Sequence, residues 1–237
     1  MPRIPVFFLF FLSFFLLAGC ATKVGPGGQN EPYFDPRYLA KTEIDRVIDA
    51  NRAEVMAGLR KVAEKLYSRN PQEWKKSGQP SSRVALSRLF SDNASFPEIE
   101  GRREGDAALF AFNPKYQGDR VLAVMAGLID MVDAAFEHKR DFYVLDDLNE
   151  QKLYNCARNI EIAIWKMSST KNANGSPLLI SNELDPNNPN LSFEREFGRI
   201  IGLLDFMSKI VADKNGRLIT RVTQSVATMF FLPVGAL

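Results

Sequence analysis

Apolar residues recur at intervals of three and four positions along most of the chain beyond residue 38, which is the spacing of one face of an α-helix. Prolines and glycines interrupt this pattern and divide it into separate elements. Asn70-Pro71 ends the first long helix in this way, and Asn215-Gly216 ends the last long one. The pattern predicts helices over 39–69, 71–76, 81–90, 119–139, from Asp146 or Asp147 to 169, 192–213 and 218–232, with a loop over 91–105.

Two of these helices are expected to form the centre of the fold. The helix over 119–139 has its large apolar side chains on one face and its small and acidic side chains on the other. The helix that ends at Ser169 has a main apolar stripe, and Ile162 and Trp165 add apolar surface behind it, so we expect it to be buried on two sides. The stripe of this second helix consists of Leu153, Ala157, Ile160, Ile164 and Met167.

Of all the segments, the last one, over 218–232, is the hardest to assign as helix or strand from the pattern. Several of its residues are β-branched, which suits a strand, but its apolar positions follow helical spacing, so we predict a helix. The chain has no internal repeat of roughly 34 residues, which disfavours a tetratricopeptide-type solenoid. The sequence therefore predicts a single all-α domain over 39–237, built as an irregular bundle of about five to seven helices.

The first twenty residues have a different pattern. Arg3 precedes an apolar run from Ile4 to Leu17, which is shorter than the roughly 20 residues that a membrane-spanning helix needs. Small residues follow, and the run ends in the sequence Leu17-Ala18-Gly19-Cys20. This stretch resembles the signal peptide and lipobox of a bacterial lipoprotein.

The resemblance implies that residues 1–19 are removed and that Cys20 becomes the new amino terminus. Its sulfur would carry a diacylglyceryl thioether and its amino group a further acyl chain such as palmitate, and several acyl chains hold a protein on a membrane far more firmly than one. Ala21, rather than Asp, after the cysteine implies sorting to the outer membrane of a Gram-negative bacterium, facing the periplasm. Residues 20–38 are rich in glycine and proline and are expected to form a flexible tether.

Composition restricts the function of the remaining domain. Of the 237 residues, 46% are hydrophobic and 24% are charged, which are values of a globular protein. The net charge of +2 includes Arg3, so the chain after the leader is nearly neutral and we expect no nucleic-acid partner. With Cys20 lipidated, Cys156 has no disulfide partner, and the domain must be held by its core alone.

An acidic trio, Asp130, Asp133 and Glu137, is the candidate interaction face, because this spacing puts three carboxylates on one face of the helix over 119–139. Such a face can bind a divalent cation, act in acid–base catalysis, lie in solvent, or pair with arginines of a neighbouring helix. We favour solvent exposure or ion pairing. The same face continues in small residues, which predicts close packing against another element: Ala123, Ala126 and Gly127.

The other notable residues are expected to be structural. His138 is the only histidine, which excludes zinc sites built from several histidines, and we expect no metal ion or other cofactor. Cys156 lies beside an apolar stripe and is predicted to pack in the core. Arg158 and Glu161, one helical turn apart, are expected to pair with each other.

Two glycines, Gly198 and Gly202, lie four residues apart in the helix over 192–213. This spacing leaves a notch on the helix surface. We predict that another helix of the same domain packs into it.

No set of catalytic residues accompanies these features, and the chain lacks the Gly-x-Ser-x-Gly sequence of serine hydrolases. We therefore predict a non-enzymatic outer-membrane lipoprotein whose periplasmic domain acts through contacts with an envelope protein, as part or accessory of an envelope or secretion assembly. One alternative is a module that binds a lipid or small molecule between the helices centred on Leu128 and Ile160. A less favoured alternative is a hydrolase that uses Asp130, Asp133 or Glu137.

Overall fold

The computed structural model describes residues 22–24, 30–32, 40–92, 94–182, 191–216 and 234–235. A hairpin of two short antiparallel strands, with Thr22 opposite Pro32, comes first within these ranges, and helices make up the rest of the regular structure. The prediction of an all-α domain is confirmed. The elements are β1 (Thr22–Val24), β2 (Asn30–Pro32), α2 (Glu43–Arg69), α3 (Pro71–Lys76), α4 (Ser82–Leu89), the 3-10 helix η2 (Pro97–Ile99), α5 (Glu104–Phe110), α6 (Arg120–Ala135), α7 (Glu150–Ser169) and α8 (Ser192–Asn215).

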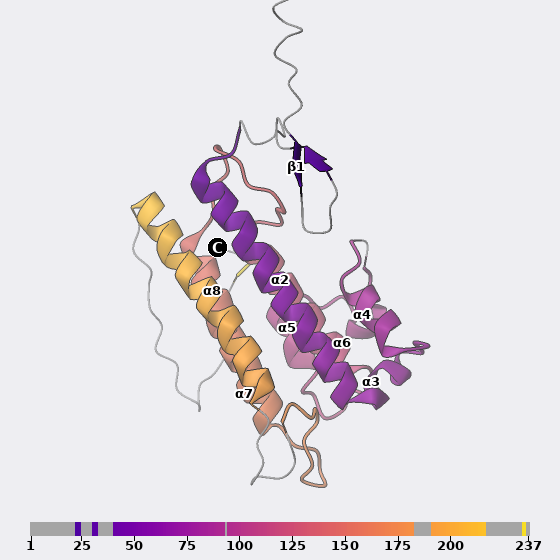
Figure 1. Cartoon of the computed structure of the whole chain (residues 1–237). Helices are drawn as coiled ribbons and strands as arrows, with labels where there is room; N and C mark the ends of the chain where they lie inside the picture. The colour runs from indigo at the N-terminus through magenta and orange to yellow at the C-terminus, as the bar shows by residue number, and fades with distance from the viewer. Residues whose placement is uncertain are drawn as a thin grey trace, which may run out of the picture.

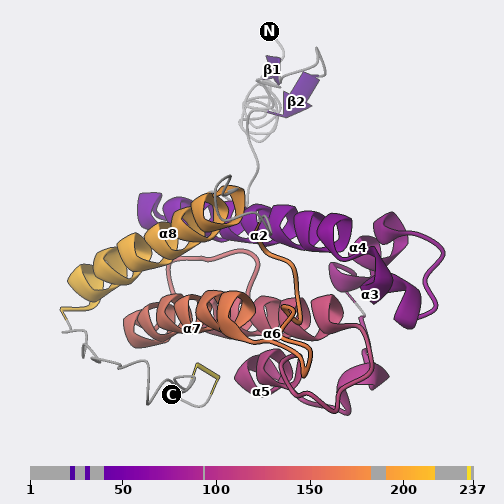
Figure 2. The ribbon, with the colours of Figure 1, turned by 90° about the horizontal axis from the view of Figure 1, so that it is seen from below.

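The long helices form two layers. Helices α2 and α8 lie side by side in one layer, and α6 and α7 lie beneath them in the other (Figures 1 and 2). The short helix α5 packs on α6, on the side away from α2 and α8 (Figure 2). Helices α3 and α4 close one end of the bundle, where both contact α6. In the part of the chain that the structure describes, no helix is long and apolar enough to cross a membrane.

The two helices predicted to be central do form the core. Leu128 of α6 and Ile160 of α7 are both fully buried in one continuous hydrophobic cluster. Ile162, on the back of α7, is buried as well, so this helix is covered on two sides as predicted. Since large aliphatic side chains contribute about 1.5–3 kcal/mol each on burial, this cluster is the main source of stability.

Local sequence explains where the long helices begin and end. Thr42 and Asp45 form a capping box at the start of α2, in which the backbone N–H of Asp45 donates to Thr42 Oγ1 at 3.2 Å and the N–H of Thr42 donates to Asp45 Oδ2 at 2.7 Å. Asp119 caps α6. Gly216 ends α8 in the left-handed conformation, with φ of 63°, which glycine adopts without steric cost.

The prediction that Asp146 or Asp147 caps α7 is wrong, because the cap is Asn149. Its Oδ1 accepts hydrogen bonds from the backbone N–H groups of Gln151 and Lys152, at 2.9 and 3.2 Å. The carboxylate of Asp146 is used elsewhere, and accepts from Lys139 Nζ at 2.5 Å and from the N–H of Tyr143 at 2.9 Å. Several polar residues before a helix compete for the cap, and sequence spacing alone does not rank them.

Helix α5 was not expected, because its first residues were assigned to the loop over 91–105. It is one of the shortest helices and contains Gly105, so its apolar periodicity is weak. It forms because α6 offers it a surface without side-chain bulk at Gly127. A Cβ atom added there would lie 2.5 Å from both the backbone nitrogen of Ala108 and the carbonyl oxygen of Glu104. The predicted close packing on the small-residue face of α6 is therefore confirmed.

The predicted packing of a helix against Gly198 and Gly202 is wrong. Both glycines lie on the exposed side of α8, and a Cβ atom added at either would meet no neighbouring group of the described residues within 4 Å. Exposed Phe206 continues this face. Three predictions, for the leader over 1–19, for Cys20 and for the segment over 218–232, concern positions outside the described residues.

Candidate functional site

A cavity of about 490 Å³ opens between α2, α4, the connection that contains η2, α5 and α6. This volume lies within the range of roughly 300–1,000 Å³ that is usual for ligand pockets. The apolar part of the wall comes from residues that are distant in the sequence. Its larger members are Met56, Phe90, Phe96, Ile99 and Ile129.

Charged side chains surround this apolar wall. Among the described residues that line the cavity, the cations are all arginines, and there is no lysine or glutamate. Two arginines reach furthest into solvent, since the side chains of Arg103 and Arg140 are 72% and 65% exposed. The charged lining residues are Arg52, Arg102, Arg103, Arg140, Asp92, Asp130 and Asp133.

Asp130 is held in the wall by a fork of two hydrogen bonds. Arg103 Nε donates to Asp130 Oδ2 at 2.7 Å, and Arg103 Nη2 donates to Oδ1 at 2.6 Å. The backbone N–H of Glu104 adds a third bond at 2.9 Å, which fixes the start of α5 against α6. This pairing raises the pKa of the Arg103 guanidinium above its usual value. Because two of its nitrogens donate to Asp130, the guanidinium of Arg103 has a fixed orientation at the mouth of the cavity.

Asp133 joins α2 to the turn after α6. Arg52 Nη2 donates to Asp133 Oδ1 at 2.9 Å, and His138 Nδ1 lies 2.8 Å from Asp133 Oδ2. The Arg52 side chain is only 13% exposed, so most of this guanidinium lies out of solvent. Asp130 and Asp133 thus occupy the ion-paired environment that was one of the two favoured predictions.

Glu137 does not share their face, and this part of the prediction is wrong. Helix α6 ends at Ala135, and Glu137 and His138 adopt left-handed backbone angles, with φ of 53° and 56°. Glu137 is thereby turned toward α7, where its Oε2 accepts a hydrogen bond from Lys152 Nζ at 2.9 Å. In the residues that the structure describes, no three His, Cys, Asp or Glu side chains are grouped as metal ligands.

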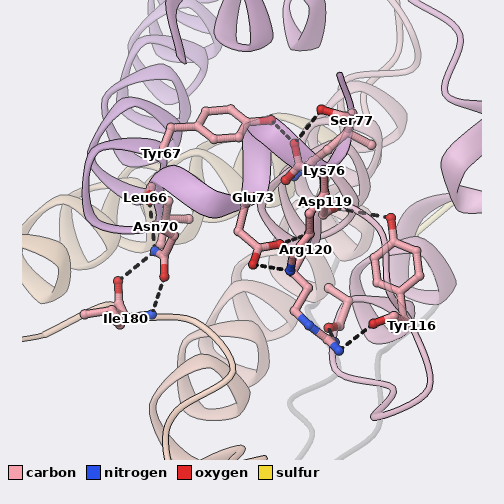
Figure 3. Close-up of polar contacts among 12 residues, drawn as sticks. Leu66, Tyr67, Asn70, Glu73, Lys76, Ser77, Tyr116, Asp119, Arg120 and Ile180 are labelled. Atoms are coloured by element: carbon pink, nitrogen blue, oxygen red, sulfur yellow. Dashed lines mark hydrogen bonds and ion pairs between the residues drawn. The ribbon is translucent and has the colours of Figure 1, made fainter. Parts of the chain in front are cut away.

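A second polar cluster lies at the start of α6 (Figure 3). Asp119 is fully buried, and its Oδ2 accepts hydrogen bonds from the Tyr67 hydroxyl at 3.0 Å and from the Ser77 hydroxyl at 3.2 Å. Its Oδ1 accepts from the backbone N–H of Leu122 at 2.9 Å. Burial raises the pKa of the Asp119 carboxyl above its usual value. With no exposed atom to meet a substrate, Asp119 acts as a structural link between α2, α3 and α6.

Arg120, the first residue of α6, belongs to the same cluster. Its guanidinium donates to the backbone carbonyls of Ala111, of Asn113 at 3.0 Å and of Tyr116 at 2.6 Å (Figure 3). Its backbone N–H donates to Glu73 Oε2 at 2.7 Å. The single residue therefore holds the whole connection between α5 and α6.

The raised pKa of Asp119 predicts a specific pH effect. The folded chain binds this proton more tightly than the unfolded chain, so the contribution of Asp119 to the free energy of unfolding is greatest below the ordinary carboxyl pKa of 3.8 and is lost as the pH rises through the folded-state pKa. Asp119→Asn keeps a side-chain oxygen for the helix cap but removes this titration. Relative to the wild type, its free energy of unfolding should increase with pH in urea titrations between about pH 3.5 and 7. A difference independent of pH would contradict burial as the cause of the shift.

The remaining predicted residues have structural surroundings. Cys156 is fully buried and burial raises the pKa of its thiol, so the reactive thiolate form is disfavoured. Arg158 and Glu161 do pair, at 3.2 Å, and Arg158 also donates to Asp205 of α8 at 2.7 Å.

Sequence reasoning located part of the cavity and missed the rest. Asp130 and Asp133 belong to the predicted acidic face, but the arginines and aromatic residues come from separate segments that no local pattern connects. The cavity also lies away from the contact between the helices centred on Leu128 and Ile160, where a ligand site was the alternative hypothesis. No family model, curated protein or solved structure matches this chain.

Proposed function

We propose that this protein is a non-enzymatic lipoprotein of the outer membrane, anchored by acyl chains on Cys20, whose periplasmic domain binds a partner protein at the cavity between α2, α4, α5 and α6. The observation that carries the proposal is the chemical composition of that cavity. Its wall is aromatic and aliphatic, and all of its cationic residues are arginines.

This composition supports binding to a protein more than catalysis. Buried centres of protein interfaces are enriched in aromatic residues, methionine and arginine, and contain little lysine or glutamate. Met56, Phe90 and Phe96 supply the apolar centre, and the arginines form a polar rim. Because each guanidinium is already oriented by a carboxylate, little side-chain entropy is lost when a partner binds.

The lipid anchor predicts a simple pattern of thiol reactivity. The chain has two cysteines, of which Cys156 is buried and Cys20 would carry the lipid. Native protein from membranes should therefore contain no thiol that reacts with a maleimide, and unfolded protein should contain one per chain. The intact mass should equal that of a chain beginning at Cys20 plus its acyl groups. A reactive thiol in the native protein, or a mass that includes the leader, would rule out the anchor.

Closing the cavity tests the binding role. Ser95 is exposed and lines the cavity, so Ser95→Trp adds bulk at the mouth without disturbing the core. We expect this substitution to abolish chemical cross-links between the protein and its partner in intact cells. Ser168→Trp, at an exposed position of α7 outside the cavity wall, is the matched control and should leave the cross-links unchanged. Equal cross-linking in both variants would contradict the proposal.

A further inference from the structure

Each oxygen of the carboxylates that line the cavity is already paired with a cationic or imidazole side chain. Both oxygens of Asp130 accept from Arg103, and those of Asp133 are paired with Arg52 and His138. The two oxygens of Asp92 accept from the two terminal nitrogens of Arg140. A ligand that brings hydrogen-bond donors would therefore compete with an existing ion pair.

Donor groups, in contrast, remain free. Arg52 Nε is buried and has no hydrogen-bond partner within the described part of the chain. Arg103 bonds Asp130 through Nε and Nη2, and its Nη1 has no acceptor among the described residues. A buried donor without a partner costs free energy, so an acceptor that reaches it is bound favourably. The cavity thus offers N–H groups to an incoming acceptor and little else that is polar.

The charged side chains of the lining also favour a ligand that brings a hydrogen-bond acceptor. Four arginines and three aspartates line the cavity, and Arg102 pairs with Glu100, which lies outside the lining. In the Arg103–Asp130 pair the carboxylate is the more withdrawn group, since the Asp130 side chain is 17% exposed and the Arg103 side chain is 72% exposed. A ligand that approaches the mouth at Arg103 therefore meets positive charge first.

The apolar wall lies next to these donors. The rings of Phe90 and Phe96 are half-buried and each is covered on one side by an arginine, Arg60 at 4.3 Å and Arg88 at 5.3 Å from the ring centroid. These contacts hold the aromatic side chains in place. A ligand must consequently combine an apolar group with one negatively charged acceptor close to it.

We propose that the cavity takes an apolar side chain of the partner protein together with the carboxylate of an adjacent Asp or Glu, bound by Arg103 and Arg52. This inference rests on the proposed function and specifies the partner's chemistry. A peptide segment fits better than a free fatty acid, because seven charged residues line the cavity and a long acyl chain offers them no partner beyond its single carboxylate.

Matched peptides test the proposal on the full lipidated chain in nanodiscs. Acetyl-Asp-Phe-amide and acetyl-Asn-Phe-amide differ only in the charge of one side chain. Saturation-transfer NMR titrations should show at least about tenfold tighter binding of the Asp peptide, the effect of a charge-assisted hydrogen bond. Raising the salt concentration should reduce this preference. Equal affinities for the two peptides would overturn the proposal without any variant.

Single substitutions test which arginines cause the tighter binding of the Asp peptide. Arg103→Gln and Arg52→Gln should each bring the two peptides to nearly equal affinity. Arg83→Gln, at an exposed position of α4 outside the cavity wall, should preserve the preference for the Asp peptide.

Tighter arginine-dependent binding of dodecanoate than of the Asp peptide would also overturn the proposal, in favour of a lipid ligand. If Ser95→Trp abolishes partner cross-links but the peptides do not differ, the proposed function stands and this inference fails. If cross-links never depend on the cavity, the proposed function fails instead.

Discussion

Replacing Arg120 with methionine should lower the free energy of unfolding by about 3–5 kcal/mol, one of the largest effects of any single substitution in this chain. The Arg120 guanidinium is buried and bonds three backbone carbonyls in the connection between α5 and α6. Methionine fills much of the same volume but donates no hydrogen bond. The carbonyls would then be buried without these partners, and the connection would lose its hydrogen bonds from the Arg120 guanidinium.

Two further variants separate hydrogen bonding from charge. Arg120→Lys keeps the charge but lacks the planar fork, so it should retain most of the destabilisation. Arg83→Met removes an exposed arginine and should change the free energy of unfolding by less than about 0.5 kcal/mol. Urea unfolding followed by tryptophan fluorescence measures all three. An effect of Arg120→Met as small as that of Arg83→Met would show that the three bonds contribute little.

Gly127→Ala should destabilise the fold by about 1–3 kcal/mol, although alanine is the better helix former. The added methyl group would lie 2.5 Å from two backbone atoms of α5, which cannot rotate away as a side chain can. Helix α5 would have to move off α6. Because Arg103 and Ala107 line the cavity, we also expect the affinity for the partner to fall.

Gly202→Ala is the matched control for this substitution. It makes the same chemical change inside a helix, but at an exposed position where the methyl group meets nothing among the described residues. Here the better helix propensity of alanine should stabilise the protein by about 0.5–1 kcal/mol. Thermal unfolding should therefore shift in opposite directions for the two variants. Shifts of the same sign would contradict the close contact between α5 and α6.

The long helices could be predicted because each depends on a local signal. Apolar periodicity over several turns identified α2, α6, α7 and α8, and the Asn70-Pro71 and Asn215-Gly216 pairs placed the C-terminal ends of α2 and α8 within a few residues. Helix α5 has no such signal, since its stability comes from a contact with Gly127 that exists only after folding. The same limit applies to the cap of α7, where the choice among Asp146, Asp147 and Asn149 depends on the path of the preceding chain.

The candidate site could be predicted only in part, for a similar reason. Spacing on one helix was enough to bring Asp130 and Asp133 together, because both belong to α6. It failed for Glu137, which follows the helix end in a left-handed turn that spacing does not reveal. The arginines and the apolar wall come from α2, α6, the start of α5 and the connections after α4 and α6. Their assembly depends on how the helices pack, which no single segment encodes.

Photo-cross-linking in living cells tests the central claim, that a partner protein docks at this cavity, most directly. Benzoylphenylalanine is introduced in place of Phe96 or Arg102, which line the cavity, and in place of Leu145 or Phe206, which are exposed elsewhere. The account predicts one discrete adduct from the two cavity positions, lost when Ser95→Trp is combined with them, and none from the other two. The same adduct from Leu145 or Phe206, with none from Phe96 and Arg102, would contradict it.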